Sequence, residues 1–126
     1  YADLFRHARS SNLPATMVVY RNQDRWDRSN VLVIDDRVAV YSKSARCPGM
    51  AHIDAGATVL RKSTLAMLPE QTPVGLNVLQ QELATKGLLG AYQSPERFYE
   101  IGSFSGLAEL EQMFARRWKA VVANAG

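Results

Sequence analysis

Residues 30–41, NVLVIDDRVAVY, contain two β-prone runs on either side of the turn-forming pair Asp35 and Asp36. Val, Ile and Tyr favour extended backbone, and Asp favours turns because its short side chain bonds to nearby backbone groups. The pattern predicts a β-hairpin with strands over residues 30–34 and 37–41. Neither turn residue is Gly, so the sequence leaves the type of turn open.

Strand and helix patterns alternate on both sides of this hairpin. An amphipathic helix is predicted over residues 3–12 and a strand buried on both faces over residues 15–20. Strands are also predicted over residues 55–61, 88–93 and 98–101, and helices over residues 63–68, 76–86 and from Ser103 or Ser105 to about Val122. The last helix is expected to bury Leu107, Leu110, Phe114, Trp118 and Val121. This interleaving predicts an α/β layered sheet in a single domain over residues 1–126.

The composition fits a soluble cytoplasmic domain. The chain has 126 residues, of which 47% are hydrophobic, enough for one modest core. Its sequence shows no membrane-spanning run and no secretion signal. The one cysteine, Cys47, cannot form an intrachain disulfide, as expected in a reducing compartment. The net charge of +3 is carried largely by arginine, which suits phosphate ligands as well as ordinary surface positions.

Two polar segments do not read as generic core. The first is YSK at residues 41–43 followed by HIDAG at residues 52–56, and the second is RFYEIGS at residues 97–103. With the hairpin and residues 16–19, these segments resemble the second half of the sugar-1-phosphate nucleotidyltransferases. The nearest match is the branch of mannose-1-phosphate and heptose-1-phosphate guanylyltransferases, over about residues 3–116.

Enzymes of this family join a sugar 1-phosphate to a nucleoside triphosphate, with Mg²⁺, and release pyrophosphate. The resemblance therefore implies a partial Rossmann-like nucleotidyltransferase sheet with flanking helices. It also implies roles for individual residues. Lys43 matches the lysine that contacts the sugar phosphate, although Ser42 stands where the family commonly has an acidic residue. Asp54 and Gly56 match a segment that accepts sugar hydroxyls, and Asn30 falls near a substrate-lining position.

The metal ligand implied by the resemblance is Glu100. Glu100-Ile101-Gly102-Ser103 resembles the family's Asp-Ile-Gly-Thr, whose carboxylate is the second ligand of the catalytic Mg²⁺. Each candidate also has a purely structural interpretation: Lys43 as a solvated lysine, Asp54 as a turn or strand cap, Gly56 as a bulge, Asn30 as part of a covering loop and Glu100 as a strand-end residue. His52 is either a phosphate contact or, more commonly for a lone histidine, a packing or surface residue.

The Gly-rich loop, Arg and Pro-Lys pair that cradle the triphosphate in this family have no match in the 126 residues. The first metal-binding aspartate is expected upstream of Tyr1. The resemblance thus implies the carboxyl-terminal portion of an enzyme, which binds sugar 1-phosphate, needs the missing half to bind nucleoside triphosphate and is inactive alone. We also expect a homo-oligomer, because loss of half a sheet exposes strand edges and apolar faces.

Two other functions remain open. The chain is alternatively a non-catalytic sugar-phosphate-binding or assembly module derived from that fold. Nucleic-acid binding rests on the basic balance alone, and we rank it last because the arginines are scattered without interleaved aromatic residues.

Overall fold

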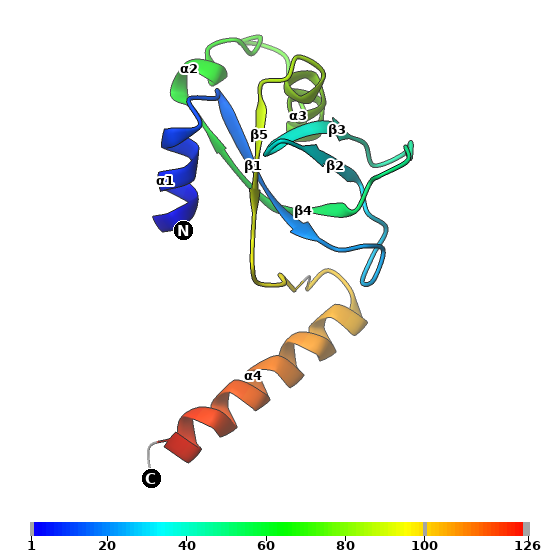
Figure 1. Cartoon of the computed structure of the whole chain (residues 1–126), viewed down its shortest axis with the longest axis vertical. Helices are drawn as coiled ribbons and strands as arrows, with labels where there is room; N and C mark the ends of the chain where they lie inside the picture. Colours follow the sequence, from blue (N-terminus) through cyan, green and yellow to red (C-terminus); the bar gives the residue numbers. More distant parts are fainter. Residues whose placement is uncertain (1, 100, 125–126) are drawn as a thin grey trace. The chain divides into compact units, whose positions relative to one another are not determined.

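The structure, a computed structural model, describes residues 2–99 and 101–124 and divides into two compact units, Tyr1–Glu96 and Arg97–Gly126 (Figure 1). The described elements of the first unit are α1 (Ala2–Ser10), β1 (Ala15–Arg21), β2 (Val31–Ile34), β3 (Arg37–Tyr41), β4 (His52–Leu60), α2 (Lys62–Leu65), α3 (Leu76–Thr85) and β5 (Leu89–Gln93). The second unit contains α4 (Phe104–Asn124). None of the helices in the described part of the chain is both long and apolar enough to cross a membrane.

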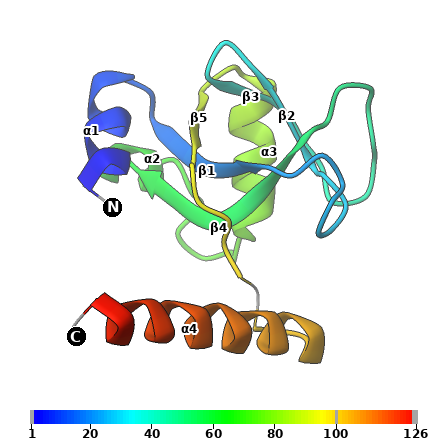
Figure 2. The same ribbon diagram turned by 60° about the horizontal axis from the view of Figure 1, so that its bottom comes forward.

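The five described strands of the first unit close into a small barrel in the order β1-β4-β2-β3-β5. The first and last strands, β1 and β5, pair in parallel, and the other neighbouring strands pair antiparallel. Closure depends on a contact between β3 and β5 in which Arg37 lies opposite Gly90. Figure 2 shows α1 and α3 on different sides of β1.

The predicted open Rossmann-like α/β sheet is therefore wrong. Such a sheet needs neighbouring parallel strands joined by helical crossovers. Here the chain reverses directly between β2 and β3, and β4 pairs antiparallel with both β1 and β2. The alternation of helix and strand patterns along the sequence predicted most of the local elements, but it carries no information on which strands pair.

Most predicted elements of the first unit are confirmed, with shifted ends. The hairpin forms, and Asp35 and Asp36 have φ angles of 48° and 57°, as a type I′ turn requires. The fourth strand begins at His52, three residues before its predicted start at residue 55. The strand predicted over residues 98–101 is absent at residues 98, 99 and 101, while Glu100 lies outside the described residues.

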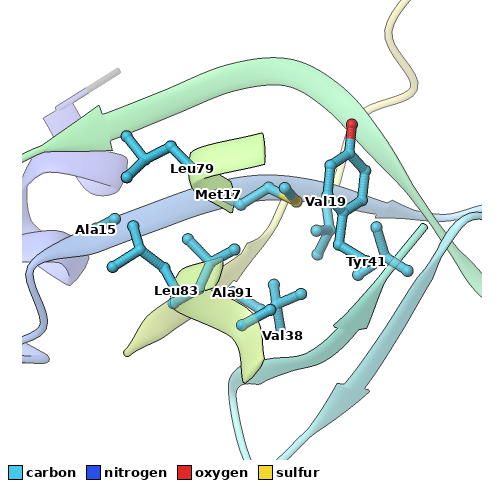
Figure 3. Packing of buried hydrophobic residues seen from close by; sticks show 11 residues of the cluster. Ala15, Met17, Val19, Val38, Tyr41, Leu79, Leu83 and Ala91 are labelled. Carbon is cyan, nitrogen blue, oxygen red and sulfur yellow. The ribbon is translucent and has the colours of Figure 1, made fainter. Parts of the chain in front are cut away.

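The barrel core is built from alternate residues of the strands and one face of α3 (Figure 3). On β1, Ala15, Met17 and Val19 belong to this core, while Thr16 and Val18 are buried on the other face. All five are buried, which confirms the prediction of a strand buried on both faces. The remaining members of the core cluster are Val31, Val38, Tyr41, Leu79, Leu83, Ala84, Leu89 and Ala91.

The loop between β1 and β2 is organised around Asn22, whose side chain is 1% exposed. Its Nδ2 donates to the Asp27 carbonyl at 2.5 Å and to Ser29 Oγ at 3.3 Å, and its Oδ1 accepts from the Trp26 N–H at 3.3 Å. Asp24 accepts from the Ser29 N–H and pairs with Arg46, and both contacts lower the pKa of its carboxyl. The loop is thus held by its own polar groups and by the contact of Asp24 with Arg46.

The second unit is the helix α4 and the residues before it. Ser103 caps the helix, because its Oγ accepts the Gly106 N–H at 3.1 Å and its carbonyl accepts the Leu107 N–H at 3.0 Å. Arg97 pairs with Glu109 and lies over the Tyr99 ring at 4.6 Å. No residue of α4 is buried in the described structure, so the burial of its apolar side stays a prediction.

Candidate binding site at the junction of three strands

Strands β2, β3 and β4 meet in one row of paired residues, in which Val31 lies opposite both Tyr41 and His52. Paired residues of adjacent strands share a face of the sheet. Because Val31 and Tyr41 belong to the core, His52 faces the barrel interior as well, and so does Asp54 two residues later. We call the group Asn30, Tyr41, His52, Asp54 and Gly56 the polar junction.

Asn30 joins the three strands by hydrogen bonds. Its backbone N–H donates to the His52 carbonyl at 2.9 Å, and its own carbonyl accepts the Ser42 N–H at 3.0 Å. Its side-chain Oδ1 accepts the Asp54 N–H at 3.0 Å. Asn30 therefore connects the start of β2 to the end of β3 and holds β4 at the position of Asp54.

A bulge in β4 follows Asp54 directly. Between the pairs Met17–Thr58 and Val19–Asp54, β1 advances by two residues and β4 by four. Gly56 lies within the bulge with φ 77°, a conformation that costs glycine little, and its N–H donates to Asp54 Oδ1 at 2.9 Å. The interpretation of Gly56 as a bulge residue is thus confirmed, and the bulge fixes the carboxylate of Asp54.

Tyr41 places a hydroxyl beside this carboxylate, with Tyr41 Oη donating to Asp54 Oδ2 at 3.3 Å. Figure 3 shows the hydroxyl oxygen of Tyr41 pointing away from the apolar side chains of the core. Burial, and then the charge and hydrogen bond of Asp54, raise the pKa of Tyr41 to about 12. All three effects disfavour the phenolate, so this hydroxyl stays a hydrogen-bond donor at neutral pH.

Replacement of Asp54 by Asn is expected to lower the pKa of Tyr41 while leaving it above the ordinary 10.0, because burial is the largest cause of the shift. The folded chain holds this proton more tightly than the unfolded chain. The Tyr41 contribution to stability is therefore complete below pH 10 and is lost as the pH rises towards 12. Ultraviolet titration of tyrosine ionisation measures the pKa, and Tyr41→Phe identifies the transition. An unchanged transition in Asp54→Asn would contradict the contact.

Gln93 on β5 lies next to His52 of the polar junction. His52 Nε2 and Gln93 Oε1 are 3.3 Å apart, whereas the buried His52 Nδ1 has no hydrogen-bond partner in the described structure. Gln93 was not predicted to take part, because its position depends on the parallel pairing of β5 with β1. Tyr41 was part of the quoted motif, but its sequence context gave no sign that its hydroxyl would meet Asp54.

The other predicted site residues lie differently. Lys43 is exposed one residue beyond the Ser42–Asn30 bond, and no acidic side chain of residues 2–99 or 101–124 pairs with it. Glu100, the predicted Mg²⁺ ligand, lies outside the described residues. Within the described ranges, no three His, Cys, Asp or Glu side chains form a group that would hold a metal ion.

No protein-family model and no curated protein sequence matches the chain. Its function is therefore inferred from its motifs and from the contacts of its own residues. Three of the predicted sugar-binding residues, Asn30, Asp54 and Gly56, lie in two separate segments and are joined by the hydrogen bonds that Asp54 makes.

Proposed function

We propose that the polar junction binds a sugar 1-phosphate, as the corresponding segments do in the nucleotidyltransferases that the sequence resembles. The observation that supports this proposal is the hydrogen bond from the Asp54 N–H to Asn30 Oδ1. It brings together two candidate residues that are far apart in the sequence. The bulge at Gly56 then holds the carboxylate of Asp54 in one orientation.

The chemistry of the polar junction suits a sugar. A carboxylate has about four lone-pair positions, and Asp54 uses one on each oxygen for Gly56 and Tyr41. Both oxygens therefore retain capacity to accept sugar hydroxyls. Such bonds to an ionised acceptor are stronger than those between neutral groups. The exposed ammonium of Lys43 supplies a compact positive charge for the phosphate.

In nucleotidyl transfer, an oxygen of the sugar phosphate attacks the α-phosphorus of a nucleoside triphosphate. Both reactants are anions, so the reaction needs charge screening and alignment. We propose that these 126 residues supply the sugar-phosphate site and take part in transfer together with separate triphosphate-binding residues. Mg²⁺ would require a carboxylate ligand, for which Glu100 is the candidate from the motif. The 126 residues alone are expected to bind without transferring.

Binding of mannose 1-phosphate, measured by calorimetry and by chemical shifts, tests the proposal. We expect Asp54→Asn to weaken binding by about tenfold or more, the loss expected for hydrogen bonds to a charged acceptor. Lys43→Ala should weaken binding of the phosphorylated sugar and leave binding of free mannose unchanged. Matched controls are Asp36→Asn in the hairpin turn and Lys86→Ala beside Glu82, both of which should bind as the parent chain does.

Two results would contradict the proposal. The first is the absence of binding to any hexose 1-phosphate by the folded parent chain, which would leave the polar junction a structural feature. The second is an equal loss of affinity in Asp54→Asn and Asp36→Asn, which would place the ligand elsewhere. Transfer activity of the 126 residues alone with GTP and mannose 1-phosphate would contradict the separate role given to the triphosphate-binding residues.

A further inference from the structure

Helix α4 carries a narrow apolar stripe, most of which is exposed in the described structure. Leu107, Leu110, Phe114, Trp118 and Val121 follow one another at intervals of three, four, four and three residues. At about 100° per residue, all five lie within about 40° of Phe114 around the helix axis. Phe114, Trp118 and Val121 are 58%, 70% and 60% exposed.

The spacing of the apolar residues is the same on both sides of Phe114. Leu107 and Val121 lie seven residues before and after it, and Leu110 and Trp118 lie four residues before and after it. A two-fold axis beside Phe114 would therefore match every apolar residue with an apolar residue of an identical helix. Leu107 would lie at the level of the partner's Val121, Leu110 at the level of the partner's Trp118, and the two Phe114 rings at the axis.

The charged residues of α4 are also divided at Phe114, with the acidic residues before it and the basic residues after it. Glu109 and Glu111 lie before Phe114, whereas Arg116, Arg117 and Lys119 lie after it. Of these, Glu111 and Arg117 flank the stripe at about 60° from Phe114 around the helix axis, and the other three lie on the opposite side of the helix. In an antiparallel pair, the acidic half of each helix runs beside the basic half of the other. A parallel pair would place the two acidic halves at the same level and the two basic halves at the same level, which is less favourable.

From these two features, we propose that α4 is a dimerisation helix that pairs antiparallel with α4 of a second copy of this chain. The pair has the self-complementary interface that two-fold symmetry requires. Its apolar centre would be buried, and its charged residues would select the antiparallel over the parallel orientation. The proposal is independent of sugar-phosphate binding, because it uses residues of the second unit alone.

Sedimentation equilibrium of the complete chain over a wide concentration range tests the association. We expect a concentration-dependent dimer whose dissociation constant rises by more than about tenfold in Phe114→Glu, since central aromatic residues dominate interface energies. Ala120→Glu is the matched control, because it introduces the same charge on a different side of the same helix and should dimerise as the parent does. Circular dichroism of both variants checks that the chain still folds.

Disulfide crosslinking tests the orientation. Two chains are prepared in a Cys47→Ser background, one with Leu107→Cys and one with Val121→Cys, and are mixed under oxidising conditions. An antiparallel pair gives mainly the mixed disulfide between the two chains, and a parallel pair gives disulfides between identical chains; mass spectrometry separates these products. A monomer at every concentration, a dimer indifferent to Phe114→Glu, or a majority of identical-chain disulfides would each overturn the proposal.

Discussion

Replacement of Met17 by Ala is expected to lower the free energy of unfolding by about 2–5 kcal/mol, the cost of removing a large buried side chain and leaving a cavity. Met17 is fully buried in the middle of β1, among the core side chains shown in Figure 3. The surrounding residues come from several strands and from α3. Because a closed barrel offers little freedom for neighbouring strands to collapse, we expect a result in the upper part of this range.

Urea denaturation measures this loss as a shift in the midpoint. The matched control is Met67→Ala, since Met67 is 67% exposed after α2 and its truncation should change stability by less than about 0.5 kcal/mol. Equal destabilisation by the two substitutions would contradict the assignment of Met17 to the core.

Replacement of Asn22 by Ala is expected to cost about 2–4 kcal/mol. The side chain of Asn22 bonds to the Asp27 carbonyl, to Ser29 Oγ and to the Trp26 N–H, and each of these hydrogen bonds contributes about 0.5–1.5 kcal/mol. The backbone of Asn22 and Gln23 also donates to the Ala51 carbonyl, so the loop is tied to the residues before β4. Loss of the side chain should therefore loosen residues 22–29 together.

Two measurements separate this effect from a general loss of stability. Chemical denaturation gives the free energy of unfolding. In native-state hydrogen exchange, the Trp26 amide of Asn22→Ala should exchange faster than in the parent chain, and the increase should be larger than at the amides of α3. Asn77→Ala, on the exposed surface of α3, is the matched control and should have little effect. Unchanged exchange at Trp26 would show that the Asn22 side chain does not hold the loop.

The sequence predicted those parts of the fold that depend on neighbouring residues. The hairpin follows from two β-prone runs around Asp35 and Asp36, and α3 follows from its leucine spacing and from Gly87 at its end. The start of β4 was missed because Asp and Gly are uncommon in strands, so Asp54 was interpreted as a substrate-binding residue or a turn or strand cap. The architecture was wrong because closure depends on pairings such as Arg37 with Gly90, which leave no periodic pattern in either segment.

The candidate site was predictable to a similar degree. The motif HIDAG identified Asp54 and Gly56, and Asn30 was placed with them through the resemblance. Their mutual hydrogen bonds needed the bulge and the row of paired strands. Gln93 was not recognised because a glutamine at the end of a short strand has no distinctive context. The role of Glu100 as a Mg²⁺ ligand stays a prediction from the motif.

The parallel pairing of β1 with β5 joins the first strand of the barrel in the sequence to the last. During synthesis on the ribosome, β1 emerges long before Leu89–Gln93 can reach it. Until then both β1 and β3 carry an unpaired edge that can pair with other extended chains. Completion of the barrel must therefore wait for residue 93 to leave the exit tunnel, and nascent chains arrested before that point should depend on chaperones to stay unaggregated.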